Sequence, residues 1–184
     1  SKQSRGLGDV YKRQGLTMAL IAAICICIPF IPSALFSSLS NLMVAPNKYI
    51  FWSFCVGVMI LIFLKSTNRD LNLREIFWIT YLFVISLVEE ITFRLSIPLV
   101  ATEFFGIGLF WFYVFLSNTL FAIIHYFTLR WKIRACILAF LGGMAFSRLF
   151  ETTEDLALVI ILHWAITFLN TPTAPKIENL AMKD

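Results

Sequence analysis

Three ionisable side chains occur within six residues of one apolar stretch. Residues 76–101 are long and apolar enough to cross a bilayer, and near their middle they contain Glu89, Glu90 and Arg94. Placing one such charge at bilayer depth costs about 2.5 to 3.5 kcal/mol on insertion scales, so these residues usually have a partner or a function. The stretch is therefore a candidate for an active site or an ion path.

Helical spacing separates the two glutamates. Glu90 and Arg94 are four residues apart, so they share a helix face and can neutralise each other as a salt bridge. Glu89 is rotated away from that pair by about 100° and needs a partner from another helix. An unpaired carboxylate in apolar surroundings is a candidate general base. We expect Glu90 and Arg94 to form a structural ion pair and Glu89 to take part in proton transfer. The alternative is that Glu89 also belongs to a structural charge cluster.

The chain has two histidines, His125 and His163, and both lie inside apolar runs. One membrane histidine is usually a packing residue, but two histidines with an unpaired glutamate on a third helix form an acid/base set that a bundle could bring together. His163, Thr167 and Asn170 share one helical stripe. The hydroxyl and the amide could donate hydrogen bonds to an oxyanion, although such side chains also commonly join membrane helices.

The composition indicates the elements that must position these residues. With 59% hydrophobic and 16% aromatic residues and a mean hydropathy of +0.83, the 184-residue chain is that of a membrane protein. We predict an all-α polytopic bundle of about six transmembrane helices. The apolar runs are 16–44, which we expect to be one helix kinked by proline, then 49–64, 76–100, 105–127, 133–150 and 156–170.

Charges in the loops predict the orientation. Basic residues cluster on one side of the predicted membrane, which the positive-inside rule makes cytoplasmic; they are Lys65, Arg69, Arg74, Arg130, Lys132, Arg134, Lys176 and Lys183. We therefore expect an integral protein of a prokaryotic cell membrane with both termini in the cytoplasm. Residues 68–75 are too polar to span and should form an interfacial segment. This distribution also explains the net charge of +4, so a nucleic-acid partner is not indicated.

The N-terminal segment differs in composition from the apolar runs that follow it. Residues 1–14 are polar, join the first apolar run abruptly, and are similar to a translated adapter sequence, so we assign them as a non-native or disordered tail. A native cytoplasmic tail is the alternative. Residues 15–172 form the predicted bundle, and 173–184 a cytoplasmic C-terminal tail. The four cysteines lack CxxC spacing and are expected to be core residues; they are Cys25, Cys27, Cys55 and Cys136.

An ordered set of motifs carries a family resemblance. The set consists of Glu89-Glu90-x-x-x-Arg94, then Phe121-x-x-x-His125, then His163 in a late apolar run. It resembles the CPBP family of intramembrane proteases, which includes CAAX prenyl endopeptidases and bacteriocin-processing or immunity proteins. The resemblance covers residues 76–170. It implies that Glu89 activates water together with His125, and that Glu90 and Arg94 support the site. Phe121, taken alone, is typical of a core residue.

The last motif departs from the family pattern. It is usually HxxxN, or sometimes HxxxD, and its histidine and partner stabilise the oxyanion. Here Thr167 holds the partner position, and Asn170 follows one turn later. The departure bears on efficiency or on the type of substrate.

The resulting hypothesis is an intramembrane endopeptidase that cleaves a peptide bond near the cytoplasmic face. Its partners would be the bilayer and a peptide or protein substrate, either prenylated or a leader peptide. The sequence leaves two possibilities for a cofactor. The protein uses none, or it binds a divalent metal such as zinc, for which Glu89, His125 and His163 would be the ligands. The alternatives are a non-proteolytic scaffold, for example in bacteriocin immunity, and a proton-coupled transporter, against which the absence of a detectable repeat counts.

Overall fold

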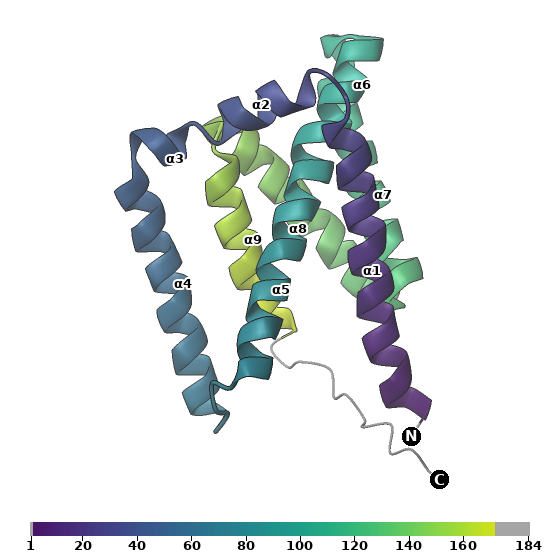
Figure 1. The fold of residues 1–184 in the computed structure, drawn as a ribbon. Helices are drawn as coiled ribbons and strands as arrows, with labels where there is room; N and C mark the ends of the chain where they lie inside the picture. Colours follow the sequence, from purple (N-terminus) through teal and green to yellow (C-terminus); the bar gives the residue numbers. More distant parts are fainter. Residues whose placement is uncertain (1, 172–184) are drawn as a thin grey trace.

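The computed structural model describes residues 2–171, and within this range all regular structure is helical. Figure 1 shows the helices as a bundle, with α5 near its centre. In chain order the α-helices are α1 (Lys2–Ile26), α2 (Ile31–Ser38), α3 (Asn41–Val44), α4 (Pro46–Ser66), α5 (Leu73–Glu90), α6 (Ile97–Phe105), α7 (Phe110–Leu129), α8 (Ile133–Thr153) and α9 (Leu156–Asn170). A π-helical segment, Ile91–Ser96, joins α5 to α6, and a short 3₁₀ turn, Ile107–Leu109, precedes α7.

The predicted all-α membrane bundle is confirmed. Among the described residues, four helical segments are long and apolar enough to cross a membrane, and a fifth is reached if one bent pair is counted as a span. The sixth predicted run is α9, which has the predicted bounds but only 15 residues. Large apolar side chains are exposed along the spans, as expected for surfaces that face lipid.

The first apolar run differs from its prediction. We expected one helix kinked by proline, but the chain bends by 104° between Ile26 and Ile31. Pro29 lies in this break, where its missing N–H and its ring prevent the helix from continuing. Pro32 lies in the first turn of α2, a position that tolerates proline. As a result α2 runs across the end of the bundle, and α3 leads into α4 (Figure 1).

The long span Leu73–Phe105 contains the π-helical segment near its middle. This segment begins directly after Glu90 and includes Arg94. Its wider turn alters the backbone hydrogen bonds, and two serines compensate: the Ser96 hydroxyl donates to the Ile91 carbonyl at 2.7 Å, and the Ser117 hydroxyl of α7 donates to the Phe93 carbonyl at 2.7 Å. Single π-turns inside α-helices are frequent at functional sites.

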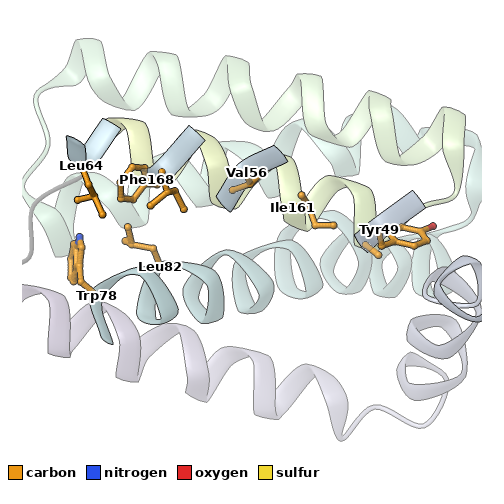
Figure 2. Packing of buried hydrophobic residues seen from close by; sticks show 9 residues of the cluster. Tyr49, Val56, Leu64, Trp78, Leu82, Ile161 and Phe168 are labelled. Atoms are coloured by element: carbon orange, nitrogen blue, oxygen red, sulfur yellow. The ribbon is translucent and has the colours of Figure 1, made fainter. Parts of the chain in front are cut away.

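A buried apolar cluster joins α4, α5 and α9. In Figure 2, Leu64, Trp78, Leu82 and Phe168 lie close together at one end of this cluster, and Ile161 lies nearer Tyr49 at the other end. Two further clusters fix the π-helical segment, one against α1 and α7 and the other against α9. Because lipid is as apolar as these side chains, close packing rather than the hydrophobic effect holds the helices together.

Polar contacts fix both ends of α9, the shortest of the apolar runs. At its start the buried Asp155 caps the helix by accepting from the Leu158 N–H at 3.0 Å, and it also accepts from Lys48 Nζ and the Tyr49 hydroxyl, each at 2.7 Å. At its end the Trp78 indole N–H donates to the Thr171 carbonyl at 2.9 Å. These contacts hold α9 in register with α4 and α5.

The contacts of the Asp155 carboxyl shift its pKa. Burial alone would raise its pKa, but hydrogen bonds from Lys48, from the Leu158 backbone and from Tyr49 outweigh that effect and lower the pKa below the ordinary value of 3.8. The carboxylate is therefore ionised across the neutral range, and it keeps these contacts.

The cysteine prediction is only partly correct. All four cysteines are free, and Cys25 is buried as expected, but Cys55 and Cys136 are only partly buried and Cys27 is exposed.

Candidate active site

The Glu89 carboxylate lies between the two histidines. Its Oε1 is 3.7 Å from His125 Nε2, and its Oε2 is 3.7 Å from His163 Nε2. The three residues come from α5, α7 and α9, and all three are buried, with Glu89 only 2% exposed. The bundle thus brings together the acid/base set that the sequence predicted from separate helices.

Hydrogen bonding defines which nitrogen of His125 faces Glu89. His125 Nδ1 is 2.8 Å from the Phe121 carbonyl oxygen. A carbonyl oxygen can only accept, so this contact assigns the proton to Nδ1 of a neutral ring. Nε2 is then an acceptor directed at the Glu89 carboxylate. Neither of these two acceptors has a proton to donate to the other, and at a separation of 3.7 Å they suit a molecule that donates to both.

Glu90 makes two contacts, one predicted and one not. Its Oε2 pairs with Arg94 Nε at 3.1 Å, as the four-residue spacing indicated. Its Oε1 is 2.6 Å from His163 Nδ1. This second contact joins α5 to α9 and orients the His163 ring, so that Nε2 points toward Glu89. The sequence contained no signal for it, because the two residues are far apart in the chain.

Phe121 contacts several members of this set. The centroid of the Phe121 ring is 4.4 Å from that of the His125 ring. The Arg94 guanidinium carbon lies 4.5 Å from the Phe121 centroid. It also packs edge-on against Phe93 in a buried cluster. Phe121 is thus a core residue, as the sequence predicted. Its ring also lines a cavity beside Glu89.

A cavity of about 430 Å³ opens beside Glu89. It extends toward the end of the bundle that carries the α7–α8 connection and the C-terminal end of α9, and its lining includes Trp131, Lys132, Asn170 and Thr171. The Trp131 ring lies 4.8 Å from that of His125. In the sequence this connection stands out only as a basic loop, with no signal that it lines the site.

Thr167 and Asn170 both line this cavity, as their shared stripe with His163 predicted. The Ser86 hydroxyl donates to the Thr167 hydroxyl oxygen across a long distance of 3.5 Å. Thr167 accepts in this contact, so its own proton is available to another acceptor. The placement is compatible with the predicted roles of Thr167 and Asn170, which stay predictions.

Gln14 also contacts the glutamate, which the sequence did not predict. Its side-chain amide donates to Glu89 Oε1 at 3.1 Å, and α1 continues through the segment that we assigned as a tail. A single glutamine at the end of a polar segment contains no signal for such a contact. Whether residues 1–14 are native stays a prediction.

Glu89, His125 and His163 are of residue types that bind zinc. In the part of the chain that the structure describes, no group of three or more His, Cys, Asp and Glu side chains is arranged to hold a metal ion. Metal binding by Glu89, His125 and His163 therefore stays a prediction.

Comparison with known proteins identifies the family. Residues 72–169, more than half of the 184-residue chain, match the family model of the Rce1-like type II CAAX prenyl endopeptidases. The chain belongs to this family, and the resemblance to CPBP intramembrane proteases is confirmed. It is therefore an integral membrane protease of the CAAX type in general, with a peptide or protein substrate. No curated protein and no solved structure matched the chain.

Proposed function

We propose that this chain hydrolyses a peptide bond near the cytoplasmic face with water activated by Glu89 and His125. The observation that supports the proposal is the pair of acceptors, Glu89 Oε1 and His125 Nε2, 3.7 Å apart at the cavity. A water molecule has two O–H groups and can donate one to each acceptor. The lone pairs of its oxygen are then free to attack a carbonyl carbon held in the cavity.

The reaction follows from this arrangement. The water oxygen bonds to the scissile carbonyl carbon while one water proton passes to the Glu89 carboxylate. The carbonyl oxygen becomes an oxyanion. When the C–N bond breaks, the proton on Glu89 passes to the leaving nitrogen and the carboxylate is restored. His125, fixed through its Nδ1 to the Phe121 carbonyl, holds the attacking water in position.

His163 and Thr167 are the proposed oxyanion donors. When both ring nitrogens of His163 carry protons, Nδ1 keeps its contact with Glu90 while Nε2 donates to the oxyanion. Thr167 lines the same cavity and has a proton to donate. Glu90 and Arg94 position His163 and act through it. The cytoplasmic location rests on the basic α4–α5 and α7–α8 connections.

The experiment is a cleavage assay on substrates of different classes. Purified protein in liposomes is incubated with a prenylated CAAX peptide, the same peptide without its prenyl group, and a leader peptide joined to its cargo, and new termini are read by mass spectrometry. Cleavage of any one class supports the proposal and identifies the substrate. If the wild type cleaves none and Thr167→Asn cleaves one, the chain is a degenerate scaffold, as in an immunity role.

A further inference from the structure

A second cavity lies on the other side of Arg94 from the active site. It has a volume of about 620 Å³ and opens at the α2 end of the bundle. Much of its lining is polar: Ser37, Ser38, Ser40 and Asn41 lie in the α2–α3 region, and Glu151 and Glu154 lie at the end of α8. We call it the outer cavity, and the active-site cavity the inner cavity. Nothing in the proposed reaction uses the outer cavity.

Arg94 separates the two cavities and lines both of them. The residue is 4% exposed, and its Nε is engaged with Glu90. Its Nη1 and Nη2 atoms have no hydrogen-bond partner among the described residues. A buried guanidinium with two unpartnered nitrogens is costly, and small polar molecules normally satisfy such groups.

Further polar groups continue the line from Arg94 toward the outer cavity. The Asn118 amide donates to the Ser147 hydroxyl at 2.9 Å, and Ser147 lines the outer cavity. Gly143 lies one turn before Ser147 on α8 and lines the inner cavity. A side-chain carbon at Gly143 would overlap Asn118 Oδ1 and would lie 3.1 Å from Arg94 Nη2. Glycine therefore lets both polar groups approach the α8 backbone, and Asn118 Oδ1 is itself unpartnered within the described part.

We propose that Arg94, Asn118 and Ser147 form a water passage through which the outer cavity supplies hydrolytic water to Glu89. The inference rests on the proposed function. A substrate peptide that reaches Glu89 fills the inner cavity and blocks the direct approach of water from that end. A separate entry from the α2 end keeps the nucleophile available while the substrate is bound. Arg94 and Asn118 supply the hydrogen-bonding groups that an ordered water needs.

Cysteine labelling tests the passage without any need for activity. In a background carrying Cys25→Ala, Cys27→Ala, Cys55→Ala and Cys136→Ala, a charged methanethiosulfonate is added to membrane vesicles of each orientation. Ser37→Cys, exposed on α2, identifies the vesicles that present the α2 end. Thr119→Cys is the matched control, because it follows Asn118 but lines a lipid-facing groove. We expect Ser147→Cys to react in the same vesicles as Ser37→Cys, and Thr119→Cys to react in neither. A Ser147→Cys protein that stays unlabelled, or reacts only from the opposite end, overturns the passage.

Turnover provides the second readout. Ser147→Ala and Ser147→Leu both remove the hydroxyl that bonds Asn118, so they differ only in how far they fill the passage. We expect kcat of Ser147→Leu to be several-fold lower than that of Ser147→Ala at unchanged KM, with similar melting temperatures for both. Equal kcat values in the two variants overturn a role in water supply. If the wild type cleaves nothing, the proposed function fails, while the labelling result still decides whether water from the α2 end reaches Ser147.

Discussion

Two adjacent glutamates have different partners because a helix points them in different directions. Glu89 faces the Nε2 atoms of both histidines, whereas Glu90 is held between Arg94 and His163 Nδ1. Because both glutamates are buried, each carboxylate needs its partners: an unpaired buried charge is destabilising. The proposed division of roles, with Glu89 reacting and Glu90 positioning His163, follows from these contacts.

The Glu90–Arg94 pair predicts a loss of stability when it is broken. Both side chains are fully buried, so Arg94→Ala should leave a buried charge without its partner and cost about 3 to 5 kcal/mol. Melting of the detergent-solubilised protein measures the effect. Arg148→Ala is the control, because its i,i+3 pair with Glu151 is largely exposed and should contribute little. Indistinguishable melting curves for the two variants would contradict the structural role of Arg94.

Thr167 predicts a kinetic effect at the residue that departs from the family pattern. An oxyanion donor acts on charge that develops in the transition state, so Thr167→Val should lower kcat by about 10²- to 10³-fold, and Thr167→Asn should keep or raise it. Steady-state kinetics on a cleaved peptide measure both variants.

Asn170→Ala extends this test along the helix. If Thr167→Val is silent and Asn170→Ala is not, the donor lies one turn further along α9. If neither variant matters in an active enzyme, α9 contributes only His163 and the oxyanion assignment is wrong.

At the scale of elements, α9 depends on contacts outside its own span. With 15 residues it is short for a bilayer-crossing helix, yet it carries His163 and Thr167. The Asp155 cap at one end and the Trp78–Thr171 hydrogen bond at the other hold it against α4 and α5. The geometry of the site therefore depends on a cap eight residues away from His163.

This cap predicts a specific pH dependence. The Asp155 pKa is lower in the folded protein than its ordinary value of 3.8, so the carboxylate contributes stability above that pH and loses it as the pH falls through the folded pKa. Wild type should melt well above Asp155→Asn at neutral pH, and the gap should close below about pH 4. Melting temperatures of both proteins across this range measure it. A gap independent of pH would show that the charge of Asp155 is not what stabilises the cap.

The sequence predicted some elements better than others for physical reasons. The run 156–170 has the predicted bounds of α9 because a capping aspartate precedes it and its apolar character ends at Asn170. The bend between α1 and α2 was missed because proline permits either a kink or a break, and tertiary packing decides between them. The π-helical segment was missed because no residue pattern specifies it; it depends on serines and on packing from other helices.

At the scale of the whole molecule, the candidate site could be predicted from the sequence on one assumption, that the separate spans converge. The types and order of Glu89, His125 and His163 predicted the set, because ionisable residues are rare in membrane helices and stand out there. The contacts of Gln14, Trp131 and Ser86 could not be predicted, because polar or aromatic residues in loops and spans are common. Family membership supports the reaction class. The roles of individual residues are tested by mutation.

Glu89→Gln tests the central claim most directly. The amide keeps the shape of the side chain but cannot accept a proton from water, so hydrolysis should be abolished while the melting temperature stays near that of the wild type. His125→Ala should also remove activity. The decisive measurement is kcat of Glu89→Gln on a peptide that the wild type cleaves: we predict no detectable turnover in a folded protein, and turnover near the wild-type rate would contradict the proposal that Glu89 activates the water.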